Sequence, residues 1–384
     1  MTTDVERATA EGLSVGVEEE FLLVEPVRGV PVPAAAAVLG RAGRVIGPEV
    51  AALHPELFAC QVEAATAPCT TLDRLTARLR QGRAALVQAA RAEGTLLVSS
   101  GVPVVTGGPP PITPGGRFAR IRDLYGGVMA DYQACGCHVH VGVPDRETAV
   151  AVMAHVRPWL PTLLALGGNS AWHAGVDTGY RSWRMVQQSR FPGSGLPPRF
   201  RGADEYDAAV ERLVAAGVLV DDTMSFWLVR PSRRLPTLEF RVADAALSVD
   251  EAVLQAALCR ALVRTALAEL ARGREAGCPD QVLGAPAVWS AARYGARGPG
   301  VDLRTGRPSP ARRLVYELLD LVTPALEDTG DLTTVRRTLS AVLAGGTGAD
   351  VQRAAAAGGA PGIVRAVAQR TADMTDRTTG TETG

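Results

Sequence analysis

Polar residues placed two positions apart interrupt four otherwise apolar segments of the chain, and this alternation predicts strands with one polar face. Successive side chains of a strand point to opposite faces. In segment 14–25, Glu18 and Glu20 therefore share one face while Glu19 takes the other. The same spacing gives three further pairs, which are Gln61 and Glu63, His138 and His140, and Glu239 and Arg241. Because a core strand normally buries an apolar face, we expect the four polar faces to line a common cavity.

Apolar residues at spacings of three and four predict helices between these strands. Gly94 ends one helix, and Pro158 and Pro161 interrupt or kink another. Strands are expected over 14–25, 56–66, 95–99, 134–143, 226–230 and 238–242. Helices are expected over 34–42, 72–93, 117–132, 146–166, 203–216, 249–272, 311–326, 332–343 and 350–372. The pattern is that of an α+β protein, and it contains neither a Rossmann glycine motif nor a P-loop.

Several segments show neither the helical nor the strand spacing of apolar residues. The Gly/Pro-rich stretch 101–116 is too long for a simple connector, and both a lid and a disordered loop remain open for it. Segment 169–201 is predicted to be a polar loop region and 302–308 a linker. We expect residues 1–12 to be flexible and the tail 374–384 to be disordered.

Composition narrows the possible partners. The chain has 384 residues with 40 basic and 40 acidic side chains, so no net field favours nucleic acid or an anionic membrane. All the basic residues are arginines, because the sequence contains no lysine. Any cation that holds a phosphate or carboxylate must therefore be arginine or a metal, and lysine chemistry is excluded.

Cysteine usage and hydropathy point to the cytoplasm. The six cysteines are scattered along the chain and no secretory signal precedes them, so a disulfide framework is not expected. No apolar run reaches the roughly 18 residues needed to span a bilayer. We expect a cytoplasmic protein with small-molecule partners and no membrane or nucleic-acid partner, and a homo-oligomer remains open.

The polar strand faces carry the candidate chemistry. Two carboxylates about 7 Å apart on one face repel each other unless a cation lies between them, and burying them unpaired is costly. A hard divalent cation, Mg²⁺ or Mn²⁺, held by oxygen ligands would solve this; a solvated edge strand is the alternative. Glutamates, histidines and arginine suit phosphoryl transfer from a metal-bound nucleotide. They suit metal-assisted hydrolysis equally well.

Several motifs, in this order along the chain, resemble those of the bacterial carboxylate–amine ligases of the glutamate–cysteine ligase type 2 family. They run from about residue 13 to residue 325, and their combination is highly specific although each alone is weak. The motifs are VGVEEEF at 15–21, CQVE at 60–63, GCHVHVG at 136–142, DTGYRS at 177–182, VRP at 229–231 with EFRV at 239–242, and ARYG at 292–295.

This resemblance implies a fold and a reaction. The fold would be that of the glutamine synthetase/guanido kinase-like superfamily, in which a curved, mostly antiparallel sheet forms an active-site funnel with helices packed outside. One catalytic domain would span residues 13–373. The reaction would be an ATP- and Mg²⁺-dependent ligation, with Mn²⁺ as a possible substitute. The γ-carboxylate of glutamate would form an acyl phosphate, and the amine of cysteine would then displace phosphate to give γ-glutamylcysteine.

The resemblance also assigns roles residue by residue. Glu18, Glu20, Glu63 and Glu239 would bind metal, with Gln61 beside them, and His138 or His140 would contact metal or ATP phosphate. Glu239 and Arg241 would act at the reacting phosphate. The substrate candidates are Asn169, Asp177, Tyr180, Ser182 and Arg184. Residues 169–172 read Asn-Ser-Ala-Trp where relatives are expected to have Asn-Ser-Pro-Phe-Trp, so the substrate loop should differ in shape.

Two other functions remain as alternatives to the ligase. A metal-dependent hydrolase could use the same carboxylates and histidines without ATP. A non-catalytic descendant could bind metal or nucleotide and serve as a scaffold. The proposed register makes a further prediction: Glu19, which points away from the cavity, should tolerate substitution better than Glu20.

Overall fold

A seven-stranded sheet organises the fold of this computed structural model, which describes residues 11–277 and 281–374. Every strand pair in the sheet is antiparallel. The strand order is β2 (Ala51–Pro55), β3 (Gln61–Thr66), β1 (Val15–Val24), β5 (Gly136–Gly142), β9 (Thr237–Asp244) and β8 (Val229–Pro231), with β4 (Leu96–Val98) beside the end of β1. The predicted α+β class with a mostly antiparallel sheet is confirmed. Most of the expected flexible N-terminus and nearly all of the expected disordered tail lie outside the described residues.

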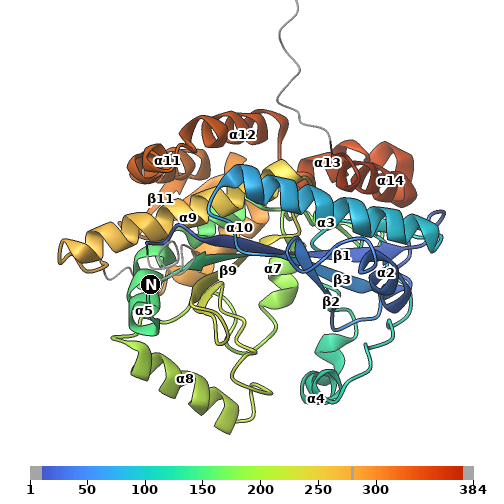
Figure 1. Cartoon of the computed structure of the whole chain (residues 1–384), viewed down its shortest axis with the longest axis horizontal. Coiled ribbons are helices and arrows are strands. Elements are labelled where there is room, and N and C mark those ends of the chain that lie inside the picture. The colour runs from blue at the N-terminus through green and yellow to red at the C-terminus, as the bar shows by residue number, and fades with distance from the viewer. Residues whose placement is uncertain (1–10, 278–280, 375–384) are drawn as a thin grey trace, which may run out of the picture.

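One face of the sheet is apolar and covered by helices. The residues between the polar positions, such as Val17, Phe21 and Val139, are at most 1% exposed. They pack under α3 (Leu72–Ala92) and α9 (Val249–Ala271), which cross this face in Figure 1. Side-chain caps start both helices: the Thr71 hydroxyl accepts from the Arg74 N–H, and the Ser248 hydroxyl accepts from the Glu251 N–H. The alternation read from the sequence therefore separates a helix-covered face from a polar one.

The remaining helices lie beside this central pair or on the opposite side of the sheet. Beyond α9 lie α11 (Ala311–Asp328) and α12 (Leu332–Gly345), while α13 (Gly348–Ala354) and α14 (Gly359–Thr371) lie over the other end of the sheet (Figure 1). On the opposite, polar side the picture shows α4 (Gly116–Tyr125), α7 (Trp183–Gln188) and α8 (Ala203–Ala215). The other helices are α2 (Ala35–Ala42), α5 (Arg146–Val156), α6 (Leu160–Leu166) and α10 (Gly284–Tyr294).

Some element boundaries differ from the prediction. The expected strand 56–66 is strand only from Gln61, because residues 57–59 bond to Pro111 and Thr113 of the long loop instead of to a neighbouring strand. The expected linker 302–308 is a hairpin of β10 (Pro299–Asp302) and β11 (Arg307–Pro310), whose turn is held by the Asp302 carboxylate. The loop region 169–201 contains α7 and a small hairpin of β6 (Trp172–His173) and β7 (Val176–Asp177).

Segment 146–166 divides at its prolines into α5, a 3₁₀ turn at Arg157–Trp159 and α6. By length and composition it could cross a membrane, with a mean hydropathy of 1.4. Length and composition alone are weak evidence of a span, because the core helix of a globular protein passes the same test. In the structure 78% of that window is buried inside the protein, as in a core helix. The five described cysteines are buried and free; Cys278 lies outside the described residues.

Candidate active site

Strand register brings the polar pairs together in one band across the sheet. Glu63 of β3 lies opposite Glu20 of β1, and Glu18 lies opposite His138 of β5. His140 lies opposite Glu239 of β9. Directly opposed residues have Cβ atoms only about 5 Å apart, so each strand places its polar side chains against those of the next. All four predicted pairs line one cavity of about 610 Å³, which confirms that the polar faces share a common space.

The first cluster of ligand-type side chains is Glu18, His138 and Glu239, whose donor atoms lie within 4.8 Å of one another. The Glu18 carboxylate lies between two imidazoles, with Oε1 3.1 Å from His140 Nε2 and Oε2 3.4 Å from His138 Nδ1. Burial raises the pKa of Glu18, but the contacts with both histidines outweigh this and hold it below its usual range. Burial, assisted by the nearby Arg241, lowers the pKa of His138 to about 4. A neutral imidazole and an ionised carboxylate are the forms that bind a metal.

The second cluster consists of three carboxylates, Glu20, Glu56 and Glu63, again with donor atoms within 4.8 Å of one another. Burial and the charge of Glu20 raise the pKa of Glu56 to about 7. Burial and the charge of Glu56 raise the pKa of Glu63 well above its usual range. Three mutually repelling carboxylates of this kind are the oxygen-rich donor set that suits Mg²⁺ or Mn²⁺. The residues present therefore fit a hard divalent cation.

Metal binding at the second cluster should depend on pH. A cation must displace the proton that burial and repulsion place there, so we expect Mg²⁺ affinity to rise between about pH 6 and about pH 8, with release of protons. Titration calorimetry in two buffers of different ionisation enthalpy measures the Mg²⁺ affinity and the number of protons released. In Glu56→Gln the pH dependence should be weaker. An affinity that stays constant across this range would contradict the assignment.

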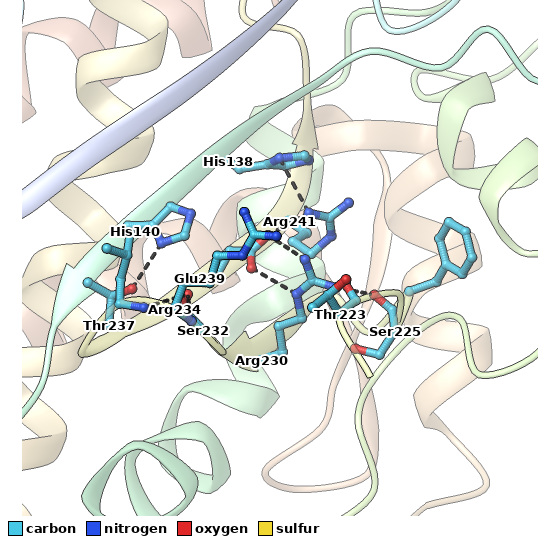
Figure 2. Close-up of polar contacts among 12 residues, drawn as sticks. His138, His140, Thr223, Ser225, Arg230, Ser232, Arg234, Thr237, Glu239 and Arg241 are labelled. Carbon is cyan, nitrogen blue, oxygen red and sulfur yellow. Dashed lines mark hydrogen bonds and ion pairs between the residues drawn. The ribbon is translucent and has the colours of Figure 1, made fainter. Parts of the chain in front are cut away.

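Glu239 also anchors a row of arginines. Its carboxylate lies 2.8 Å from Arg230 Nε and 2.5 Å from an Arg241 nitrogen (Figure 2). Arg230 is held further by the carbonyl oxygens of Thr223 and Ser225, at 2.9 and 2.7 Å. Burial raises the pKa of Glu239, but the two guanidinium groups outweigh it and hold the group well below its usual range. Glu239 therefore stays ionised and fixes both arginines in the cavity wall.

Two charged residues that contact the predicted site residues in the cavity, Glu56 and Arg230, were not predicted from the sequence. Glu56 lies in the connection before β3, where the two-residue period that identified the other carboxylates does not apply. Arg230 stands opposite Glu239 on β8, and it was quoted in the VRP motif without a role. The usable signal for Arg230 was the charge complementarity between two adjacent predicted strands.

The predicted substrate residues divide into two sets. Arg184 lines the cavity. Gln61, which was predicted beside the metal ligands, also lines it, although its amide already donates to the Ala134 carbonyl at 2.8 Å. Four others do not line it, and other partners occupy their side chains. Asn169 donates to the Ser99 and Ala245 carbonyls, Asp177 pairs with Arg353, the Tyr180 hydroxyl accepts from Trp289, and Ser182 donates to Asp244. The structure therefore does not bring Asn169, Asp177, Tyr180 and Ser182 to the cavity.

The wall that faces the polar sheet is partly apolar, although it also contains Arg117 and Asp222. Its apolar part is built from the segment before β3, from α4 and the turn after it, and from the segment before β8. The apolar members are Leu57, Phe118, Ile121, Met129, Tyr132, Met224 and Phe226. Tyr132 and Phe226 also belong to a cluster of four contacting aromatic rings with Tyr125 and Phe191. The cavity thus offers charged groups on the sheet and a partly apolar surface opposite.

The fold is of the glutamine-synthetase-like class, and the family match identifies the protein as a ligase that forms C–N bonds. The model of glutamate–cysteine ligase family 2 matches residues 14–367, and the chain belongs to that family. A relative from Saccharopolyspora erythraea named "Putative glutamate--cysteine ligase 2-2" is 54% identical over 91% of this chain and 90% of its own. A relative from Nocardia farcinica named "Putative glutamate--cysteine ligase 2-1" is 46% identical, over 92% and 91%.

Solved structures support the same fold at low sequence identity. Glutamate–cysteine ligase from Francisella tularensis, in complex with AMP, superposes with a TM-score of 0.68 at 15% identity, covering 94% of this chain and 89% of that one. A bifunctional glutathione synthetase from Pasteurella multocida gives the same TM-score at 16% identity, covering 97% of this chain and 55% of the larger protein. The predicted glutamine-synthetase-like architecture is confirmed.

Proposed function

We propose that this protein joins the γ-carboxylate of glutamate to the amine of cysteine in an ATP- and Mg²⁺-dependent reaction. One observation carries the proposal: the strand register gathers two carboxylate-rich clusters and a row of fixed arginines in one cavity of a family-2 ligase. The AMP bound to the Francisella ligase supports a nucleotide as co-substrate. We place the reaction in the cytoplasm, with small molecules as its partners.

The carboxylates and one imidazole would hold the metal ions. Glu18, His138 and Glu239 form one donor set, and Glu20, Glu56 and Glu63 form the other. Mg²⁺ bound there would neutralise phosphate charge and orient the phosphates. His140 donates to or accepts from the Thr237 hydroxyl at 2.9 Å (Figure 2). Its other ring nitrogen faces Glu18. His140 would therefore orient the Glu18 carboxylate.

The arginines would stabilise charge on the reacting groups. A glutamate carboxylate oxygen would attack the γ-phosphorus, and the bond to ADP would break, giving an acyl phosphate. The amine nitrogen would then attack the acyl carbon, form the C–N bond and release phosphate. Arg241 and Arg230 are both fixed by Glu239, and they would present guanidinium donors to the phosphoryl oxygens. Arg184 would meet a further oxyanion of the substrate.

Trapping with hydroxylamine tests the first half of this reaction without presupposing the amine. With ATP, Mg²⁺ and L-glutamate, hydroxylamine should convert the acyl phosphate to a hydroxamate, with stoichiometric ADP formation. Without glutamate, ADP formation should fall to background. Cysteine in place of hydroxylamine should give γ-glutamylcysteine, detected by mass spectrometry.

Thermal stability separates this function from metal-dependent hydrolysis. A ligand that binds the native state must raise its melting temperature. We expect ATP with Mg²⁺ to raise it more than Mg²⁺ alone. No additional shift at saturating nucleotide would count against the ligase and in favour of the hydrolase.

A further inference from the structure

Arg184 is a buried cation that forms no direct ion pair among the described residues, although its charge interacts with those of Asp244 and Glu20. The residue is 3% exposed. Its guanidinium nitrogens lie 3.3 Å from the Arg241 carbonyl oxygen and 3.4 Å from His138 Nε2. A buried charge with so few partners is costly to keep. Its placement must therefore be imposed by the surrounding structure.

The helix that carries Arg184 cannot impose this placement by itself. Helix α7 has six residues, and helices this short are not stable in isolation. It begins at Ser182, whose hydroxyl accepts from the Met185 N–H at 3.2 Å. The Arg184 N–H donates to the hydroxyl of Ser170 at 3.0 Å. Both hydroxyls donate hydrogen bonds to the side chain of a third residue.

That residue is Asp244, which is fully buried at the end of β9. Its Oδ1 accepts from the Ser182 hydroxyl at 2.7 Å. Its Oδ2 accepts from the Ser170 hydroxyl at 2.7 Å and from the Asn169 N–H at 2.9 Å. One carboxylate thus joins the start of α7 and the preceding loop to the strand that carries Glu239 and Arg241.

Two glycines make room for the two ends of this connection. A Cβ on Gly101 would lie 2.7 Å from the Asp244 carboxyl carbon. A Cβ on Gly136 would lie 2.5 Å from an Arg184 guanidinium nitrogen. Any larger residue would displace the carboxylate or the guanidinium. The backbone is therefore shaped to hold both groups in these positions.

We propose that Asp244 is a positioning residue that fixes Arg184 in the cavity, so that this guanidinium can meet a substrate oxyanion. The inference rests on the proposed ligase function. It also gives a role to Ser182 and Asn169, which lie outside the cavity: both belong to the hydrogen-bonded connection through Asp244. On the far side of the same loop, the buried Gln352 donates to the Asn169 carbonyl at 2.9 Å and accepts from the Ala171 N–H at 2.9 Å.

Asp244→Asn is the main test, because it keeps the size of the side chain but must turn an N–H group toward one of three donors. We expect kcat/KM for glutamate-dependent ADP formation to fall about 10- to 100-fold. The relative changes in kcat and in KM should match those measured for Arg184→Ala. In the double variant, Asp244→Asn should add little to the effect of Arg184→Ala, since a positioning residue acts only through its target. Ser182→Ala removes the bond to Asp244 and also the cap that accepts from the Met185 N–H, and it should show a loss of the same kind.

Hydrogen–deuterium exchange supplies a readout that needs no activity. In Asp244→Asn, amides of residues 182–188 should exchange faster while those of α8 stay unchanged. The matched control is Asp331→Asn, which alters another buried aspartate, the partner of Arg260 in the helical layer. It should leave both kcat/KM and the exchange of 182–188 unchanged.

The outcomes separate the two proposals. Unchanged exchange in 182–188, or a full further loss of kcat/KM when Asp244→Asn is added to Arg184→Ala, would overturn the positioning role. A wild-type protein without glutamate-dependent ADP formation would overturn the proposed function instead. In that case the exchange measurement alone decides whether Asp244 positions α7.

Discussion

Replacing Glu19 by alanine is expected to destabilise the protein by about 3–5 kcal/mol. Glu19 points to the helical side of β1, where its carboxylate lies 2.6 Å from Arg83 of α3. The two side chains are 3% and 1% exposed. Arg83 also donates to the carbonyl oxygens of Ala246 and Leu247. Alanine would leave this buried guanidinium without its counter-charge, and a typical total stability is only about 5–15 kcal/mol.

Denaturant unfolding in EDTA measures this loss without interference from metal. Glu211→Ala, which removes an exposed carboxylate on α8, is the matched control and should change stability by less than about 0.5 kcal/mol. Removing both partners in Glu19→Ala/Arg83→Ala should cost less than the sum of the single changes. A loss below about 1 kcal/mol for Glu19→Ala would show that the pair is not important for stability.

The buried Glu19–Arg83 pair bears on two inferences from the sequence. The alternation correctly placed Glu18 and Glu20 on one face and Glu19 on the other. The pair argues against the further expectation that Glu19 tolerates substitution better than Glu20, because pointing away from the cavity means pointing into the core. Its partner Arg83 is 64 residues away, on a helix whose position over the strand no local pattern reveals.

The difference between local strand geometry and tertiary contacts explains which parts of the site were predictable. Period-two spacing identifies Glu63, His138 and Glu239 because a strand fixes the direction of each side chain. Glu56 and Arg184 occupy the cavity through a connection and a short helix, where direction depends on tertiary contacts. Conversely, Asn169 lies near polar motifs in the sequence, but its amide is used to hold the loop between Ser99 and Ala245. The direction of side chains on the predicted strands was therefore read well, whereas the side chains of connections and loops required the structure.

Glu63→Gln is expected to change stability and activity in opposite directions. The change removes one of three repelling carboxylates, so in EDTA the variant should unfold at a higher temperature than the wild type. A carboxyl group whose folded pKa is raised favours folding at low pH, and this advantage is lost as pH rises from its unfolded value toward the folded one. The gain in melting temperature should therefore be larger at about pH 8 than at about pH 5.5.

Activity should fall at the same time by at least about 100-fold, since changing even the partners of metal ligands commonly costs 10- to 100-fold. Mg²⁺ should raise the melting temperature of Glu63→Gln less than that of the wild type, which reverses their order when metal is added. Glu211→Gln, with the same loss of charge on the exposed surface, should leave stability and ADP formation unchanged. If Glu63→Gln kept both wild-type activity and the full Mg²⁺ shift, Glu63 would not belong to the metal site. If it were less stable than the wild type in EDTA, the three carboxylates would not be repelling one another in the folded protein.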